Sequence, residues 1–428
     1  MSAYAEFIER KMRRNPNSGF TPLELSDALY PFQRDLTEWS LQRGRAAIFA
    51  DCGLGKTPMQ LEWAHRVARQ TGGDILILAP LAVSAQTVHE GEKFGIDVTV
   101  CREPGDIRAG VNITNYDRFE RFAGHHWTGV VLDESSILKA FDGKTRAALI
   151  EWAQRFPYRL CCTATPSPND YTELGGHADF LGVLSHKQML AEFYVNDGIS
   201  AGSWRLKGHA CTVYWRWVAT WARALRSPAD LGYDDDRFSL PDLQVETISV
   251  EADAVSDDRL FAVPVATLAE RRQARRESIS QRVAIAQQII NGSTRPWVVW
   301  CDLNAESEAL TRVITDAVEV RGSDHPDIKE ERLIAFSTGE ARVIVTKPSI
   351  AGWGLNWQHC ADVLFVGLSD SYEQYYQAVR RCWRYGQQQS VRVVIVASSR
   401  EQTVLENIAR KERQAREMFA EIVRAMNG

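Results

Sequence analysis

The sequence lacks the features that mark several classes of protein. None of its eight cysteines forms a C-x-x-C pair, which predicts neither structural zinc nor a disulfide framework, but buried thiols in a reducing compartment. No apolar run reaches the roughly 18 residues of a membrane span. The first twenty residues, interrupted by Glu6 and Glu9, are not typical of a secretory signal. Repeats and low-complexity tracts are also missing. We therefore expect a cytoplasmic globular protein with no membrane partner.

Neither sign of charge predominates. Lys and Arg total 50 and Asp and Glu total 55, so the formal net charge is −5. This balance excludes a wholly basic nucleic-acid coat protein, but it leaves room for a local basic groove because net charge averages the whole surface. A chain of 428 residues that is 45% hydrophobic and 25% charged is typical of about two to four globular domains.

Short apolar runs rich in β-branched residues recur along the chain, each followed by a longer amphipathic stretch. They are 46–50, 74–79, 111–114, 129–133 and 159–163 in the first half, and 297–301, 318–321, 342–346, 363–367 and 392–397 in the second. Continuous apolar strands that alternate with helices predict parallel sheets covered on both faces. Two such series predict two α/β lobes.

The segment between the two series is rich in Gly, His and Trp and shows no strand alternation. We interpret it as a mainly helical insertion that ends in an interlobe linker, with its tryptophans packed in a core. The predicted organisation is an N-terminal extension (1–24), lobe 1 (25–170), this insertion (171–245), lobe 2 (246–400) and a C-terminal helix (401–428).

A glycine-rich segment, A-D-C-G-L-G-K-T, occupies residues 50–57 between a predicted strand and a predicted helix. Glycines such as Gly53 and Gly55 let backbone N–H groups curl around an anion, and the helix N-terminus adds partial positive charge. Lys56 would then reach the β- and γ-phosphates of a nucleotide, and the Thr57 hydroxyl would ligate Mg²⁺. A purely structural turn is the alternative, which the strand-then-helix context disfavours.

Two acidic residues, Asp133 and Glu134, follow the apolar strand 129–133. A strand buried on both faces presents such residues at the carboxyl edge of its sheet, beside the phosphate loop. We expect Asp133 to hold Mg²⁺, through water, and Glu134 to polarise the attacking water. A solvated strand end would be the alternative without the loop.

A basic segment in the second half, residues 377–387, reads Q-A-V-R-R-C-W-R-Y-G-Q. Arg381 and Arg384 lie three residues apart and share a face if the segment is helical. A pair of guanidinium groups from a second lobe can neutralise the charge that develops on a transferred phosphoryl group. The flanking Gln377 and Gln387 disfavour a merely solvated helix end.

Together these segments resemble the superfamily-two helicases, and within them the Swi/Snf-type ATP-dependent double-stranded DNA translocases, over about residues 30–397. The resemblance implies two RecA-like lobes, the P-loop NTPase helicase core. It also implies roles for further residues in matching motifs: Gln33 in reading adenine, Pro80, Thr114 and Asn115 in contacting nucleic acid, Thr163 and Thr165 in coupling hydrolysis to lobe movement, Gly354 in binding the nucleotide, and Gln377, Arg381 and Arg384 in catalysis.

Some positions depart from the family pattern. Ser136 stands where the family has a histidine, so the coupling through that histidine must be rerouted or lost. Trp383 is unusual in its motif, and we expect it to pack rather than to stack on a base. Arg271 and Arg275 would lie along one helix and could face phosphates, although a solvated helix face is the favoured alternative. Residues 204–209 and 215–233 are similar to stand-alone bacteriophage or prophage members.

The resemblance implies an ATPase that uses ATP and Mg²⁺, hydrolyses ATP in the interlobe cleft and moves on duplex DNA, in a bacterial or phage-infected cell. We expect a monomer with a possible protein partner in replication, recombination or defence. A strand-separating helicase would share every motif. An RNA helicase is a less favoured alternative, because the segments at 355–356 and 386–387 resemble the DNA translocase branch. In a different class, the chain could be an ATP-switched adaptor or clamp that binds DNA and recruits a partner.

Overall fold

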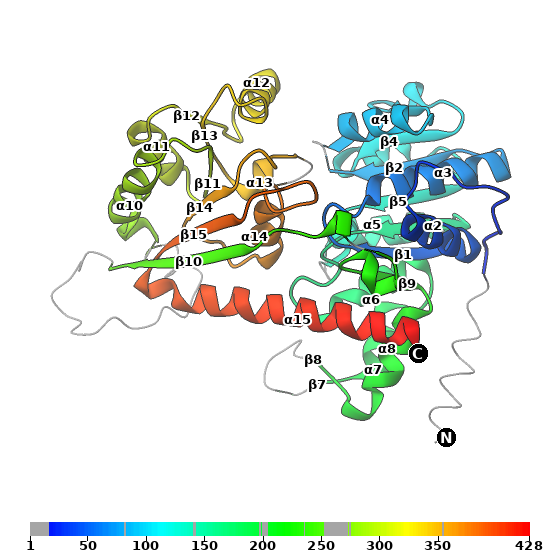
Figure 1. Ribbon diagram of the computed structural model, residues 1–428. Coiled ribbons are helices and arrows are strands. Elements are labelled where there is room, and N and C mark those ends of the chain that lie inside the picture. Colours follow the sequence, from blue (N-terminus) through cyan, green and yellow to red (C-terminus); the bar gives the residue numbers. More distant parts are fainter. Residues whose placement is uncertain are drawn as a thin grey trace. The chain divides into compact units, whose positions relative to one another are not determined.

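The computed structural model describes residues 17–80, 83–139, 143–196, 198, 204–234, 236–251, 273, 275–352 and 355–428. The chain divides into two units. Unit 1 runs to Phe238 and also includes Gln414–Gly428, whereas unit 2 comprises Ser239–Arg413. Each unit is built on its own parallel sheet (Figure 1).

The sheet of unit 1 has seven strands in the order β3-β4-β2-β5-β6-β1-β9, all paired in parallel. Its strands are β1 (Arg45–Ala50), β2 (Ile75–Ala79), β3 (Val98–Val100), β4 (Val111–Asn115), β5 (Gly129–Asp133), β6 (Tyr158–Cys162) and β9 (Ala222–Leu225). Strands β2, β4 and β5 are buried at every position, as expected for strands covered on both faces.

Successive residues of these strands enter two different cores, because side chains alternate across a sheet. Ala46 and Ile48 belong to one core, together with side chains of α2 (Pro31–Arg43) and α3 (Lys56–Thr71). Ala47 and Phe49 belong to the other, which also contains side chains of the helices α5 (Lys144–Ala153), α6 (Leu174–Leu181), α7 (His186–Phe193) and α8 (Cys211–Ala219).

The remaining elements of unit 1 are short. They are α4 (Ser84–Lys93), the antiparallel pair β7 (Tyr194–Asn196) and β8 (Trp204–Leu206), and the 3₁₀ turns η2 (Pro104–Asp106), η3 (Tyr116–Phe122), η4 (Ser135–Lys139), η5 (Tyr171–Glu173), η6 (Gly208–Ala210), η7 (Pro228–Leu231) and η8 (Asp236–Phe238).

The predicted insertion is part of unit 1 up to Phe238. Its tryptophans do pack in a core: Trp215, Trp217 and Trp221 are buried in the cluster that also holds Ala47 and Phe49. Strand β9 was not expected. It is the edge strand beside β1. Three of its four residues are buried, so the strand shows no alternation of apolar and polar residues.

The sheet of unit 2 has six strands in the order β10-β15-β14-β11-β13-β12, again all parallel. Its strands are β10 (Leu243–Val250), β11 (Trp297–Cys301), β12 (Ala317–Glu319), β13 (Val343–Thr346), β14 (Asp362–Val366) and β15 (Val391–Ser398). The helices are α10 (Ile279–Asn291), α11 (Asn304–Val313), α12 (Pro326–Ser337), α13 (Pro348–Ala351) and α14 (Tyr372–Val379), with the 3₁₀ turn η9 (Ser399–Glu401) before the last helix.

The prediction of two α/β lobes with parallel sheets is confirmed, and each of the ten predicted apolar runs coincides with a strand to within a few residues. Strand β10 was missed because it is an exposed edge strand, buried only at its end, although it pairs with β15 over its whole length.

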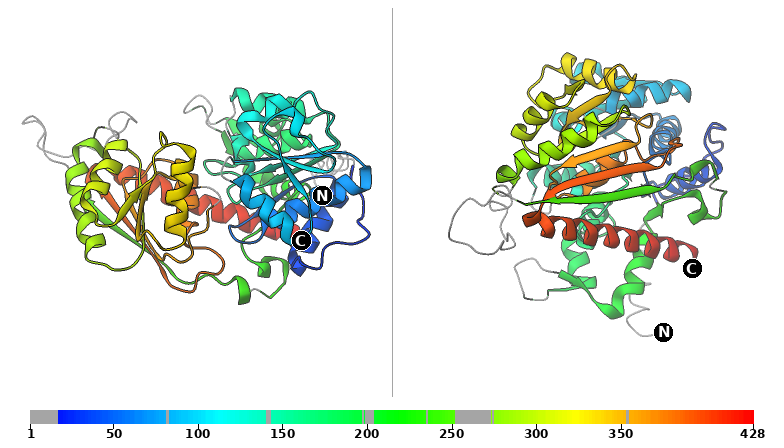
Figure 2. Two further views of the ribbon diagram at one scale, coloured as in Figure 1. Left: turned by 90° about the horizontal axis from the view of Figure 1, so that it is seen from above. Right: turned by 60° about the vertical axis from the view of Figure 1, so that its left-hand side comes forward.

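The last helix, α15 (Gln402–Asn427), is unbroken (Figures 1 and 2). It starts in unit 2 and ends in unit 1, so it is not the separate element that the sequence boundaries suggest. Met418, Phe419 and Ile422 are buried in the core of unit 1, and Tyr171 donates its hydroxyl proton to the carbonyl of Gln414 (3.1 Å). Within the described ranges, no helix has the length and apolarity that crossing a bilayer demands.

Candidate nucleotide site

The glycine-rich loop joins β1 to α3, as its sequence predicts. Gly53 and Gly55 have φ of 88° and 77°, in the left-handed region where glycine carries no steric penalty. A Cβ on Gly55 would overlap Nε2 of Gln33, so a larger residue there would have to displace that side chain as well as adopt a positive φ. Lys56, at the start of α3, donates from Nζ to the carbonyls of Ala50 (3.0 Å) and Asp51 (3.4 Å). Its ammonium group therefore lies against the loop that would hold phosphate.

Gln33 also lies at this loop. It is buried on α2, and its Nε2 donates to the carbonyl of Leu54 (3.0 Å) while its Oε1 accepts from the backbone N–H of Tyr30 (3.0 Å). The fold thus brings Gln33 and Gly55 together, although the sequence separates them. The predicted role of Gln33 in reading adenine requires a position beside this loop.

Asp133 ends β5 beside α3. Gln60, one turn after Thr57 on that helix, donates from Nε2 to Oδ1 of Asp133 (2.8 Å), and the Tyr116 hydroxyl donates to the Asp133 carbonyl (2.6 Å). Burial raises the pKa of Asp133, and the hydrogen bond from Gln60 and the charge of Lys56 oppose that rise. A buried carboxylate of this kind suits a cation. Gln60 was not among the residues predicted from the sequence, although its position three residues after Thr57, on the same face of α3, could have indicated a place in this site.

Glu134 follows with a backbone φ of 57°, one of two non-glycine residues with positive φ in the described ranges. Its carboxylate accepts a hydrogen bond from the Thr163 hydroxyl (3.2 Å), and that hydroxyl accepts from the backbone N–H of Thr165 (3.1 Å). Thr163 and Thr165 follow β6, the neighbouring strand. The motif predicted to couple hydrolysis to movement is therefore in direct contact with the residue predicted to polarise water.

The next residue, Ser135, contacts a histidine that the sequence analysis did not identify. The Ser135 hydroxyl lies 3.1 Å from Nε2 of His177 on α6, and both side chains are fully buried. Burial lowers the pKa of His177 to about 3, so its ring is neutral. Ser136, at the position of the family histidine, is buried as well. No local pattern links position 135 to position 177.

In unit 2, the two predicted arginines meet at one carbonyl. Arg381 donates from Nη1 to the backbone oxygen of Leu355 (2.9 Å), and Arg384 donates from Nη1 to the same atom (3.1 Å). Arg381 also contacts Gln377, with Nη2 bound to its Oε1 (3.0 Å). The two arginines thus bind the backbone of Leu355, and Gln377 contacts Arg381. Gly354, the neighbouring predicted residue, lies outside the described residues.

The rest of the segment 377–387 makes further contacts in unit 2. Gly386 has a φ of 90°, and a Cβ there would lie 2.7 Å from Oε1 of Gln358. Gln387 donates to the carbonyls of Gln358 and Cys360, both at 3.0 Å. Trp383 packs, as expected: it donates from Nε1 to the carbonyl of Pro241 (2.7 Å), and the guanidinium of Arg380 lies 4.2 Å from its ring.

The residues predicted to contact nucleic acid in unit 1 differ in their exposure. Thr114 is buried and donates its hydroxyl proton to the Cys101 carbonyl (2.7 Å), so that group is not available to a phosphate. Asn115 is also buried, whereas Pro80 is partly exposed.

Arg275 needs a correction. It is 4% exposed and forms ion pairs with Glu401 and Asp302 at 2.6 Å each, so it is neither a phosphate contact nor part of a solvated face. Its charge is neutralised inside the unit, by acids that lie far from it in the sequence. Arg271 lies outside the described residues.

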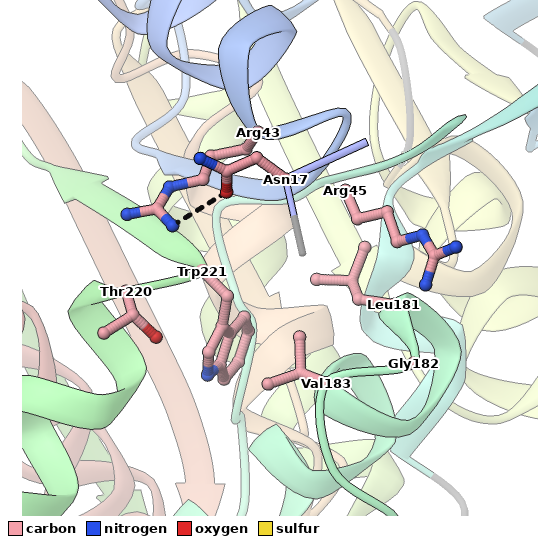
Figure 3. Close-up of a pocket in the computed structure, with 8 residues that line it drawn as sticks. All are labelled: Asn17, Arg43, Arg45, Leu181, Gly182, Val183, Thr220 and Trp221. Carbon is pink, nitrogen blue, oxygen red and sulfur yellow. Dashed lines mark hydrogen bonds between the residues drawn. The ribbon is translucent and has the colours of Figure 1, made fainter. Parts of the chain in front are cut away.

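A pocket in unit 1 lies apart from these motifs. Its lining includes Asn17, Arg43, Arg45, Val183 and Trp221 (Figure 3). Arg45 starts β1, so the pocket lies at the end of the strands opposite the glycine-rich loop. Arg43 donates to Asn17 (3.1 Å), and the guanidinium groups of Arg43 and Arg45 point away from one another (Figure 3). They therefore do not converge on a common ligand.

The described part of the chain contains no group of three or more His, Cys, Asp or Glu side chains arranged to hold a metal ion. Mg²⁺ in nucleotide sites keeps several waters and is bound by one or two protein oxygens together with substrate phosphates. Asp133 and Thr57 provide hard oxygen ligands of the required kind.

Two models of known protein families match this chain. Residues 32–197 match the model of the SNF2-related domain, and residues 281–386 match that of the helicase conserved C-terminal domain. Among solved structures, the chain is similar to the SWI2/SNF2 ATPase core of Sulfolobus solfataricus in complex with dsDNA, with 17% identity, a TM-score of 0.46, and coverage of 94% of this chain and 96% of that one. A search of curated protein sequences finds no match.

The two domain matches, in this order and on two parallel-sheet units, define a superfamily-two helicase core, and with it a nucleic-acid-dependent ATPase. The chain belongs to the Swi/Snf-type branch of that superfamily.

Proposed function

We propose that this protein is an ATP-driven motor that moves along duplex DNA without separating its strands. The observation that carries the proposal is the continuous set of contacts from the glycine-rich loop to Thr165. Lys56 and Gln33 lie at the loop, Gln60 binds Asp133, and Thr163 binds Glu134. A protein that only bound nucleotide would need the loop but not this link from an acidic pair to a neighbouring strand end.

Each residue has a defined part in this proposal. Gln33 reads the adenine, the backbone of Gly53 and Gly55 and the Lys56 ammonium bind the phosphates, and Thr57 and Asp133 hold Mg²⁺. When bound, Mg²⁺ neutralises charge on the β- and γ-phosphates. Glu134 orients the attacking water. Arg381 and Arg384 stabilise the charge that develops on the phosphoryl group.

Arg381 and Arg384 also suggest how hydrolysis causes movement. Both donate to the carbonyl of Leu355, so a change in their position is passed directly to the segment around 355. On the other unit, Thr163 and Thr165 connect Glu134 to the end of β6. Nucleotide turnover that alters both sets of contacts would move the segments that grip DNA. Grip through the DNA backbone predicts weak sequence preference and strong salt dependence.

The test compares ATPase rates with duplex DNA, single-stranded DNA, branched DNA and RNA, each at two salt concentrations. We expect duplex DNA to stimulate most and the stimulation to fall at the higher salt. Lys56→Ala and Glu134→Gln should abolish turnover, whereas Lys93→Ala, which removes an exposed lysine of α4, should not. Turnover like that of the wild type in either site variant would refute the site assignment.

Displacement assays separate the motor from its alternatives. Displacement of a triplex-forming strand without separation of the duplex supports the proposal, whereas ATP-dependent strand separation indicates a helicase. An ATPase rate that no nucleic acid changes would favour the ATP-switched adaptor. The intact Glu134, Arg381 and Arg384 argue against an inactive ATPase, which supports an active motor over that adaptor.

A further inference from the structure

The backbone of Glu134 adopts a conformation that its side chain does not favour. Its φ of 57° lies in the left-handed region, which residues other than glycine adopt rarely because Cβ approaches the following carbonyl. Such a conformation persists only where neighbouring contacts enforce it. The contacts around Glu134 therefore determine where its carboxylate lies.

Three of the hydrogen bonds around this residue link its surroundings to other parts of unit 1. Before it, the Tyr116 hydroxyl donates to the carbonyl of Asp133 (2.6 Å). At its side chain, Thr163 donates to the carboxylate (3.2 Å). After it, the Ser135 hydroxyl lies 3.1 Å from Nε2 of His177. Tyr116 follows β4, which lies two strands from β5, and Thr163 follows β6, the neighbour of β5. The third contact ties the residue after Glu134 to helix α6.

The bond between Ser135 and His177 is suited to a fixed structural link. Both side chains are fully buried, so water does not compete for the bond. The ring of His177 is neutral, so each of its two nitrogens either donates or accepts a hydrogen bond. A hydroxyl can do both, so the Ser135 hydroxyl can pair with Nε2 in either tautomer of the ring.

Helix α6 is itself tied to the loop after β6. The carboxylate of Glu173, which precedes α6, accepts from the backbone N–H (3.0 Å) and the Nδ2 (2.8 Å) of Asn169. That loop begins with Thr163, the residue that binds the Glu134 carboxylate. A closed circuit of contacts thus runs from Glu134 through Thr163 and Asn169 to α6, and back through His177 and Ser135.

We propose that His177 is a positioning residue, which holds Glu134 in its left-handed conformation through Ser135 and links it to helix α6. Position 136, where the family has a histidine, is a buried serine in this chain. The inference rests on the proposed function in one respect: Glu134 is taken to orient the water that attacks ATP.

The test measures kcat, KM and the affinity for a fluorescent ADP analogue. We expect His177→Phe, which removes the ring nitrogen that pairs with Ser135, to lower kcat at least about tenfold, because small displacements of a catalytic group are costly. KM and nucleotide affinity should stay within about twofold. His177→Gln, whose amide can reach Ser135, should restore most of kcat. A purely structural role would not separate kcat from KM or respond to the conservative variant.

Three further variants strengthen the test. His186→Phe removes another buried histidine nine positions along, on α7, which contacts Arg146 rather than the acidic pair, and it should leave kcat unchanged. Ser135→Ala should lower kcat as His177→Phe does. The double variant should lose no more than either single variant, because both remove the same bond. This comparison also covers the case in which His177→Phe fails to fold.

The outcomes distinguish this inference from the proposed function. If Lys56→Ala turns over ATP like the wild type, the site assignment fails. If Lys56→Ala is inactive but both His177→Phe and Ser135→Ala keep the wild-type kcat, the role of His177 is refuted. If DNA does not stimulate the wild type, the motor fails, and His177 is still judged on basal turnover. If the wild type hydrolyses no ATP, faster amide hydrogen exchange confined to residues 133–137 in His177→Phe supports the link, and unchanged exchange overturns it.

Discussion

The contact between Gln60 and Asp133 leads to a quantitative prediction. Asp133 is 6% exposed, and the Nε2 of Gln60 lies 2.8 Å from its Oδ1. A hydrogen bond to a charged group contributes about 1.5–3 kcal/mol. If this bond orients Asp133 for Mg²⁺, its loss should weaken the apparent affinity for Mg²⁺ by about 10- to 100-fold. This is the range seen when outer contacts of metal ligands are removed.

The variant to use is Gln60→Met, which keeps the volume of the side chain and removes the donor. ATPase rates at saturating ATP, measured against free Mg²⁺, give the midpoint of activation. We expect this midpoint to rise about 10- to 100-fold, with a maximal rate that high Mg²⁺ largely restores. Gln42→Met changes an exposed glutamine of α2 that contacts Glu38 and should leave the midpoint unchanged.

One result would refute this reasoning. An unchanged midpoint in a folded Gln60→Met protein would show that Asp133 does not depend on Gln60 for its metal-binding geometry. Asp133→Asn, measured in the same assay, would then show whether Asp133 affects Mg²⁺ activation at all.

Three further predictions concern stability and nucleotide binding. Burial lowers the pKa of His177 to about 3 and that of His186 to about 4. From pH 6.5 down to 5 these histidines therefore bind protons only in the unfolded protein, and each should lower the stability of unit 1 by about 1.4 kcal/mol per pH unit. Urea unfolding at several pH values should give a smaller slope of unfolding free energy against pH for His186→Gln, and an identical slope would contradict the assignment. Phe419→Ala should lower the free energy of unfolding of unit 1 by about 3–5 kcal/mol. Arg424, whose side chain is 72% exposed, is the control, and Arg424→Ala should change that free energy by less than about 0.5 kcal/mol. Equal effects of the two variants would show that the end of α15 does not pack in the core of unit 1. Gly55→Ala should weaken nucleotide binding, measured with a fluorescent ADP analogue, by at least about tenfold, because φ is positive and the new Cβ meets Gln33; unchanged binding would place the nucleotide elsewhere.

The parts of the fold that the sequence predicts are those whose cause is local. Strands such as β2 and β5 are apolar at almost every position because both faces are covered, and this leaves a continuous run in the sequence. Strands β9 and β10 lie at sheet edges, where one is too short to show a pattern and the other is largely exposed. Their pairing depends on the neighbouring strand rather than on their own composition.

The same division holds for the site. The glycine-rich loop, Asp133 with Glu134, and Arg381 with Arg384 are short segments in which spacing alone brings the groups together. The acceptor of the two arginines, the carbonyl of Leu355, is a backbone atom that no residue pattern reveals. Arg275 shows the opposite failure: its charge suggested phosphate contact, but Glu401, 126 residues away, neutralises it inside unit 2.

The sequence alone determined the class of fold, the nucleotide-binding motif and the identity of the acidic and basic groups, because these depend on periodicity and on spacing within one element. Only the tertiary structure decided which side chains orient those groups. Gln60 and Asp133 are 73 residues apart, and Ser135 and His177 are 42 apart. Each pair meets because two separate elements pack in the same core, and hydrogen bonds of this kind leave no periodic trace in the sequence.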